Sequence, residues 1–359
     1  MEFALRARPV GLQWAILFGL SAALTLVLEL VHLPAALLLG PMIAAIVIAA
    51  LEGTVRVPAL PFSLAQGIIG LLIARSIPVS VFAEIGKDWP VFAGGVVFVI
   101  AAASVLGYVL ARFQVLPGST AVWGSSPGAA TAMVLMAEAS GADVRLVAIM
   151  QYLRVVCVAA VASLVAKIWS PGANIARPAI VWFPHVDERQ FILTLLVAVG
   201  GALAGPRLGI LAGSLILPLV AGVVAQDFGH LTITLPPWLL AMSYTLVGWT
   251  IGLRFTRDIL VYAARSLPRV LASIFGLVGV CAAFAGLLAW KAGIDPLTAY
   301  LATSPGGADS VAIIAASTKV DVPFVMTMQT ARFVIVLLIG PALSGFIAKH
   351  TPTPASGPR

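Results

Sequence analysis

Ten long stretches of the chain carry no aspartate, glutamate, lysine or arginine. They are residues 9–28, 30–51, 57–74, 89–111, 113–137, 190–206, 208–226, 228–253, 270–290 and 333–348. An α-helix needs about 20 apolar residues to cross a hydrocarbon core roughly 30 Å thick, and most of these stretches are that long. Because they are continuous and do not alternate apolar with polar residues, a β-barrel is not expected. We therefore predict an all-α integral membrane protein.

Composition and charge agree with this prediction. The chain has 359 residues, of which 61% are hydrophobic and 10% charged, outside the usual range of soluble domains. The first apolar stretch leads directly into another one, so we expect a retained membrane span and not a cleaved signal. The net charge of +7 is spread over short loops, which suits orientation in a lipid bilayer. Direct nucleic-acid binding is not expected, because no compact basic domain is present.

One apolar segment that is interrupted by polar residues occurs twice. At an offset of 178, residues 124–158 match residues 302–336 at 13 of 35 positions. Apolar bias explains the alanine and valine matches, but not Ser-Pro-Gly, Asp, Gln and Arg in one register. A weaker similarity joins residues 37–47 to residues 210–220. We predict two membrane repeats, at residues 1–170 and 190–350, joined by a connecting loop at 171–189.

The Ser-Pro-Gly segment leaves two topologies open. If it enters the membrane and returns, each repeat has five crossings and the second repeat is inverted. If it crosses fully, each repeat has six crossings and the repeats are parallel. The re-entrant arrangement gives the larger cytoplasmic excess of lysine and arginine, so we favour inverted repeats, a common design of secondary transporters.

Each Ser-Pro-Gly copy is predicted to start a helix inside the membrane. Serine suits the N-cap and proline the first helical position, while glycine permits close approach of a ligand or a helix. The N-terminal end of such a half-helix attracts anions. The predicted frame of a substrate site is Ser126, Pro127, Gly128, Ser304, Pro305 and Gly306. A kink that serves helix packing is the structural alternative.

Buried polar residues follow each copy. Gln151 and Arg154, like Gln329 and Arg332, are three positions apart and share a helix face. A guanidinium and an amide could hold a carboxylate together. Asp309, which replaces Thr131 of the first copy, is expected either to neutralise an arginine or to couple transport to H⁺ or Na⁺.

Residues outside this set suggest no further chemistry. Asp143 and Asp321 are predicted to be helix N-caps. The cysteines, Cys157 and Cys281, are expected to be small buried side chains. The four histidines are scattered without helical pairing, so neither a metal centre nor another cofactor is expected.

The stretch LPAALLLGPMIAA near the start, the two Ser-Pro-Gly copies and the paired MQYLR and MQTAR resemble the AbrB-type membrane protein family, which is defined by the AbrB duplication domain. The resemblance covers nearly the whole chain and implies a multi-pass protein of the bacterial inner (plasma) membrane. Members carry names that refer to a transcriptional regulator or an ammonia monooxygenase. The scattered histidines argue against an enzyme, and no stretch outside the membrane is long enough to form a DNA-binding module.

Our functional hypothesis is a secondary transporter of a small organic anion or amino-acid-like solute. The alternative is a membrane sensor that binds such a solute and regulates gene expression indirectly, and a structural scaffold is a third reading. Small residues in GALAG, Gly201–Gly205, allow close helix packing, either within one chain or in a homo-oligomer.

Overall fold

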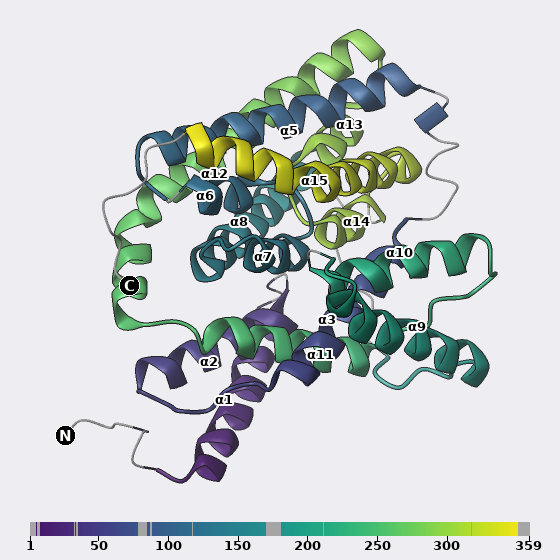
Figure 1. Cartoon of the computed structure of the whole chain (residues 1–359). Coiled ribbons are helices and arrows are strands. Elements are labelled where there is room, and N and C mark those ends of the chain that lie inside the picture. Colours follow the sequence, from purple (N-terminus) through teal and green to yellow (C-terminus); the bar gives the residue numbers. More distant parts are fainter. Residues whose placement is uncertain are drawn as a thin grey trace. The chain divides into compact units, whose positions relative to one another are not determined.

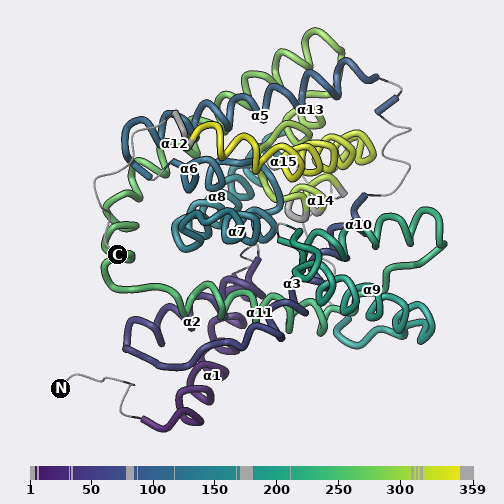
Figure 2. The backbone as a smooth tube through the Cα atoms, in the orientation of Figure 1, coloured from purple at the N-terminus to yellow at the C-terminus, as the bar shows by residue number. Residues whose placement is uncertain are grey.

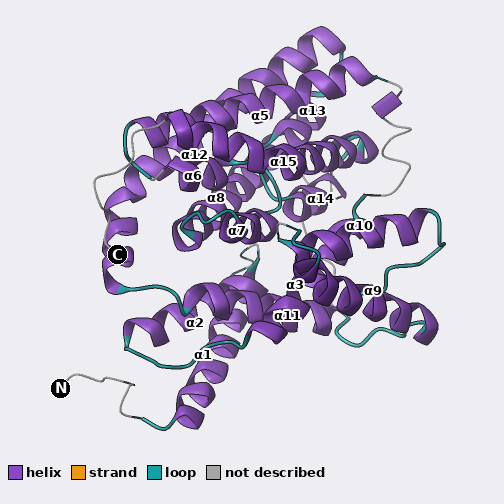
Figure 3. Cartoon of the chain, in the orientation of Figure 1, coloured by secondary structure: helices purple, strands orange, loops and turns teal. Residues whose placement is uncertain are grey.

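A computed structural model gives the structure of the chain. It describes residues 5, 8–31, 33, 35–77, 85, 86, 88–116, 118–169, 181–210, 212–316 and 318–350. Over these residues the chain is helical and contains no strand (Figure 3). Six of the described helices, α1, α5, α8, α9, α12 and α15, are long and apolar enough to cross a membrane. The prediction of an all-α membrane protein is confirmed.

The chain folds into two compact units. Unit 1 comprises Met1–Pro78 and Ala179–Val261, and unit 2 comprises Val79–Pro178 and Tyr262–Arg359. Each unit therefore combines one segment of each predicted repeat. The units describe packing, whereas the repeat boundaries at residues 170 and 190 describe sequence similarity and stay a prediction.

Unit 1 holds three helices from each half of the chain (Figure 1). They are α1 (Val10–Leu30), α2 (Ala36–Ala50), α3 (Ala59–Arg75), α9 (Glu188–Arg207), α10 (Gly213–Asp227) and α11 (Pro237–Gly252).

The helices of unit 1 recur in the register of the repeat. The N-caps of α1 and α9 are Pro9 and Asp187, 178 residues apart. Helices α2 and α10 both start after an alanine in the left-handed conformation, Ala35 and Ala212. These two alanines are 177 residues apart, whereas the weak similarity of residues 37–47 to residues 210–220 has an offset of 173, so the helices correspond in a different register from that similarity.

Two glycines at equivalent positions let helices of opposite halves cross closely. A Cβ added to Gly70 in α3 would lie 2.4 Å from the carbonyl oxygen of Leu215 in α10. A Cβ added to Gly248 in α11 would lie 2.7 Å from the carbonyl oxygen of Leu38 in α2. Only glycine permits such backbone contact. Helix α3 therefore packs on α10, and α2 packs on α11.

Unit 2 contains the Ser-Pro-Gly segments. Its helices are α5 (Trp89–Arg112), α6 (Gly118–Ser125), α7 (Ala130–Ala139), α8 (Val144–Trp169), α12 (Arg257–Ala292, from Tyr262 onward), α13 (Pro296–Thr303), α14 (Ala308–Ala316) and α15 (Val322–His350). Helices α5 and α12 pack along each other, with the rings of Phe98 and Phe284 stacked at 4.0 Å. Both Ser-Pro-Gly segments lie between two short helices, so the predicted breaks are confirmed.

Candidate functional site

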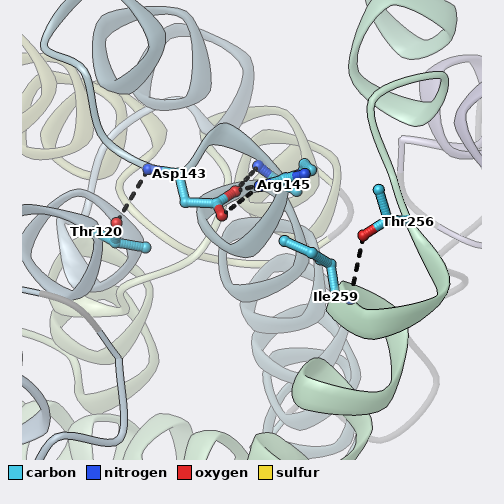
Figure 4. A network of polar contacts seen from close by, with 5 residues as sticks. All are labelled: Thr120, Asp143, Arg145, Thr256 and Ile259. Atoms are coloured by element: carbon cyan, nitrogen blue, oxygen red, sulfur yellow. Dashed lines mark hydrogen bonds and ion pairs between the residues drawn. The ribbon is translucent and has the colours of Figure 1, made fainter. Parts of the chain in front are cut away.

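Helices α6 and α7 form a hairpin alongside α8, which we call the first hairpin (Figure 2). At its base, the backbone N–H of Asp143 donates to Thr120 Oγ1 at 3.0 Å (Figure 4). Helix α7 ends at Ala139, close in sequence to this contact. At its tip, Arg154 Nη1 donates to the Ser126 carbonyl at 2.7 Å. Asp143 and Arg154 are eleven positions apart, about 16 Å along α8, so the distance from base to tip is about half the thickness of a bilayer core.

The second hairpin, α13 and α14, has the same construction alongside α15. The N–H of Asp321 donates to Thr298 Oγ1 at 3.3 Å at the base. Arg332 Nη1 donates to the Ser304 carbonyl at 2.8 Å at the tip. The base contacts were missed by the sequence analysis, although Thr120 and Thr298 stand at the repeat offset of 178, four residues before the aligned window.

Asp143 and Asp321 do cap helices, as predicted, but with different geometry. Asp321 Oδ1 accepts from the N–H of Phe324 at 3.0 Å, the usual N-cap reach. Asp143 Oδ1 accepts from the N–H of Arg145 at 3.0 Å, and its carboxylate also binds the Arg145 guanidinium at 2.9 Å (Figure 4).

The predicted role of Ser-Pro as the start of the second helix is wrong. The backbone N–H and the hydroxyl of Ser126 both donate to the Val122 carbonyl, at 2.9 and 2.7 Å, so Ser126 ends α6. Helix α7 begins only at Ala130, and its N-cap Ala129 offers no side-chain cap. Serine satisfies the carbonyl four residues back, and a proline directly after the helix end prevents continuation.

The second copy differs from the prediction in the same way. Ser304 is the C-cap of α13 and its N–H donates to Tyr300. Helix α14 begins at Ala308. The Ser-Pro pairs thus end the first helix of each hairpin and leave its carbonyl groups pointing toward the tip.

Gln151 and Arg154 bind these carbonyl groups in the first hairpin. Gln151 Nε2 donates to the carbonyls of Trp123 and Ser126 at 2.6 and 3.0 Å. Arg154 Nη1 also donates to the Ser125 carbonyl at 3.1 Å. Arg154 Nη2 donates to Gln151 Oε1 at 2.6 Å, which confirms that the two side chains share a helix face.

The second hairpin repeats this network residue for residue. Gln329 Nε2 donates to the carbonyls of Leu301 and Ser304 at 2.7 and 3.2 Å. Arg332 Nη2 donates to Gln329 Oε1 at 2.5 Å. The groups expected to hold a carboxylate thus satisfy helix-end carbonyls in both copies, and their contact with a solute stays a prediction.

The two copies differ in what their arginines join. Arg332 Nε donates to the Pro127 carbonyl of the first hairpin at 2.8 Å, and Nη2 reaches the Gly306 carbonyl at 3.4 Å. Arg332 therefore links both tips. Among the described residues, Arg154 binds the first tip alone, and its buried Nε has no hydrogen-bond partner there.

Positive charge is concentrated where the tips meet. Arg154 and Arg332 are each 2% exposed and donate to Ser126 and Pro127, whose carbonyls are consecutive. Among the described side chains, no carboxylate lies within ion-pair distance of either guanidinium. Asp309 lies in the first turn of α14, but its side chain falls outside the described residues, so its predicted pairing stays untested.

The predicted glycines make room for neighbouring side chains of the protein. A Cβ on Gly306 would lie 3.0 Å from Val158 Cγ1. The second tip, including Pro305, therefore packs on α8 beyond Arg154. A Cβ on Gly128 would lie 2.8 Å from Met133 Cε within the first hairpin.

Helix α15 runs antiparallel to α6. It contacts Pro127 through Arg332, and eight residues later a Cβ on Gly340 would lie 2.8 Å from the Trp123 ring. As α15 advances from Arg332 to Gly340, its contacts therefore move from Pro127 back to Trp123, toward the start of α6. Helix α6 runs parallel to α8, because Thr120 contacts Asp143 and Ser126 contacts Arg154. The equivalent helices α8 and α15 therefore run in opposite directions.

Metal-ligand geometry is not observed in the part of the chain that the structure describes, where no group of three or more His, Cys, Asp or Glu residues could hold an ion. Cys157 and Cys281 are free, and Cys281 is buried. The site is therefore made of hydrogen-bonded carbonyl, amide and guanidinium groups.

Comparison with known proteins identifies related chains. Residues 37–348 match the family model described as "Transition state regulatory protein AbrB". The chain is 45% identical over 342 residues to "Putative regulator AbrB" of Escherichia coli (strain K12), an alignment that covers 95% of this chain and 98% of the relative. It is 26% identical over 296 residues to "Uncharacterized protein YhjN" of Bacillus subtilis (strain 168), with coverage of 78% and 76%.

Proposed function

The chain belongs to the AbrB family of membrane proteins, and on that premise we propose that it is a secondary transporter of a small organic anion or amino-acid-like solute in the bacterial plasma membrane. The observation that carries the proposal is the pair of hairpins in unit 2, which reach halfway along α8 and α15 and meet at two buried guanidinium groups. Broken helices that meet at membrane depth are the usual site architecture of secondary transporters.

We further propose that the two repeats are inverted, which suits a transporter. Ser-Pro-Gly segments that return to the side of the membrane at which they start would leave each repeat with an odd number of crossings. Helices α8 and α15 are antiparallel, as inversion requires. In an inverted pair, exchange of the two repeats' conformations produces the state that opens to the opposite side.

An anion is the solute class that the charge at the tips favours. Arg154 and Arg332 are both buried, and a charged side chain within a membrane is costly unless a partner or a cavity faces it. The Arg154 Nε–H, which has no hydrogen-bond partner in the described part of the chain, could donate to a carboxylate. The predicted frame residues would then line the site by their position at the tips, and Asp309 would serve in coupling to H⁺.

A binding panel followed by a flux assay tests the proposal. The purified protein is heated with carboxylates, amino acids, phosphates or amines, with and without Na⁺. We expect an anion to raise the unfolding temperature, and Arg154→Ala to remove that rise. Arg145→Ala is the matched control, because Arg145 pairs with Asp143 at the base of the hairpin. The stabilising anion should then enter liposomes that contain only this protein.

A membrane sensor is the second candidate, and the name of the Escherichia coli relative favours it. A sensor would bind the solute in the stability panel without moving it into liposomes. A panel without any hit, together with arginine variants that are merely less stable, would reject both candidates in favour of a structural scaffold.

A further inference from the structure

Four oxygen atoms surround the Arg332 guanidinium. They are the carbonyl oxygens of Pro127, Ser304 and Gly306 and the Oε1 of Gln329, at distances between 2.5 and 3.4 Å from its nitrogens. We call these four atoms the oxygen cage. Three segments of unit 2 contribute to it, and Arg332 itself is 2% exposed. The cage is therefore a buried, preformed set of acceptors around one positive charge.

The oxygen cage lies where the C-terminal ends of two short helices, α6 and α13, converge. Pro127 follows the C-terminal end of α6, and Ser304 follows that of α13. A helix C-terminus carries about half a negative charge. In secondary transporters, half-helix C-terminal ends and unwound carbonyl groups commonly coordinate Na⁺ or H⁺. Here a side-chain guanidinium occupies that position.

We propose that the oxygen cage is a cation-binding site whose permanent occupant is the Arg332 guanidinium. The native chain carries its own cation, so free Na⁺ has no place at the cage. When residue 332 has no charge, the cage accepts a free monovalent cation. Guanidinium and its small alkyl derivatives fit best, because they reproduce the planar donors that the cage already binds.

Two substitutions separate charge from hydrogen bonding. Arg332→Lys keeps one positive charge, whereas Arg332→Gln keeps hydrogen-bond donors without charge. Thermal unfolding in detergent is measured in choline chloride and during a titration with guanidinium chloride at constant total chloride. We expect the lysine variant and the native chain to be insensitive to low millimolar guanidinium. The glutamine variant should unfold at a lower temperature, and guanidinium should raise that temperature saturably.

An alanine variant and a control outside the cage test the same inference. Arg332→Ala leaves space for ethylguanidinium, which should stabilise it more than ammonium does. Arg145→Ala, which lies outside the cage, should show no rise with either ion. Equal behaviour of glutamine and lysine at position 332, or the absence of saturable rescue, would overturn the inference.

The consequence for transport rests on the proposed function and has its own measurement. Solute uptake by the native chain should proceed at the same rate when Na⁺ is replaced by choline. Uptake that stops in choline would overturn the inference. Absence of uptake for every solute would instead count against the proposed function, and the unfolding experiments, which use no solute, would still decide on the cage.

Discussion

Arg154 and Arg332 occupy equivalent positions but stabilise different parts of unit 2. Both bind a glutamine and the carbonyl groups of their own hairpin. Within the residues that the structure describes, Arg332 alone also donates to the other hairpin, at Pro127. The same residue type in the same register therefore has a local role in one copy and a linking role in the other.

This difference predicts unequal costs of substitution. Arg332→Ala should lower the free energy of unfolding by about 1.5–3 kcal/mol more than Arg154→Ala, since it removes one additional charge-assisted hydrogen bond. Thermal or denaturant unfolding of the two variants side by side measures the difference. Equal losses would mean that the link between the hairpins contributes little stability.

The sequence predicted which polar residues gather, but not what they bind. The spacing of three placed Gln151 with Arg154 and Gln329 with Arg332 on one helix face, and the hydrogen bonds confirm it. The acceptors are backbone carbonyls, which every residue carries and no sequence pattern marks. For the same reason, the serine of Ser-Pro could be assigned to the wrong helix: its hydroxyl suits an N-cap and a C-terminal turn alike.

At the scale of elements, the base of each hairpin depends on one threonine. Thr120→Val and Thr298→Val preserve shape and remove the acceptor of the Asp143 or Asp321 N–H. Thr298→Val also removes the hydroxyl that donates to Asp295 Oδ2, so Thr120→Val is the cleaner variant. Each should cost about 1–3 kcal/mol, because a partly buried N–H is left without its partner. Hydrogen exchange of the hairpin and the unfolding temperature measure the effect.

Thr250→Val is the matched control for these variants. Thr250 donates within its own helix, to Leu246, and to no other described residue, so its replacement should be close to neutral. A loss at Thr250 as large as at Thr298 would show that valine itself, and not the broken base contact, causes the change.

Close contact between α15 and α6 provides a second prediction at this scale. Gly340→Ala should destabilise the protein by about 1–3 kcal/mol through overpacking, because the new Cβ would lie 2.8 Å from the fully buried ring of Trp123. Gly345→Ala in the same helix meets nothing within 4 Å and should be neutral or stabilising. Unfolding temperatures of the pair measure this, and matching losses would contradict the packing argument.

The path of the chain through the short helices could be predicted only in part from the sequence. The apolar stretch 113–137 predicted a membrane segment and Pro127 predicted its break, but charge counting could only favour one of two topologies. The base of the first hairpin is held by the contact between Thr120 and Asp143, at residues that a membrane-span pattern does not distinguish.

For the whole molecule, inverted repeats predict opposite placement of equivalent loops. Ala142 and Val320 are 178 residues apart and follow the two hairpins. In a variant without Cys157 and Cys281, Ala142→Cys and Val320→Cys should react with a membrane-impermeant thiol reagent from opposite sides of the membrane. Labelling of intact cells and of inverted vesicles measures this. Reaction of both from the same side would establish parallel repeats.

At this scale the sequence predicted the duplication but not how the halves combine. Similarity along the chain divides it near residue 170, whereas packing joins the first three helices of one half to the first three of the other. The contacts responsible are those of Gly70 and Gly248 with carbonyl oxygens of the opposite half. A glycine in an apolar stretch does not reveal its partner.

Because these glycine crossings join helices of opposite halves, they can form only after the second half of the chain has been synthesised. Helices α2 and α3 are complete once residue 75 has been made, yet their partners α11 and α10 begin at residues 237 and 213. At typical translation rates this interval lasts on the order of ten seconds. Through that time the glycine faces of the first helices remain open within the bilayer, so a lipid or a membrane chaperone must cover them until the second half of the chain arrives.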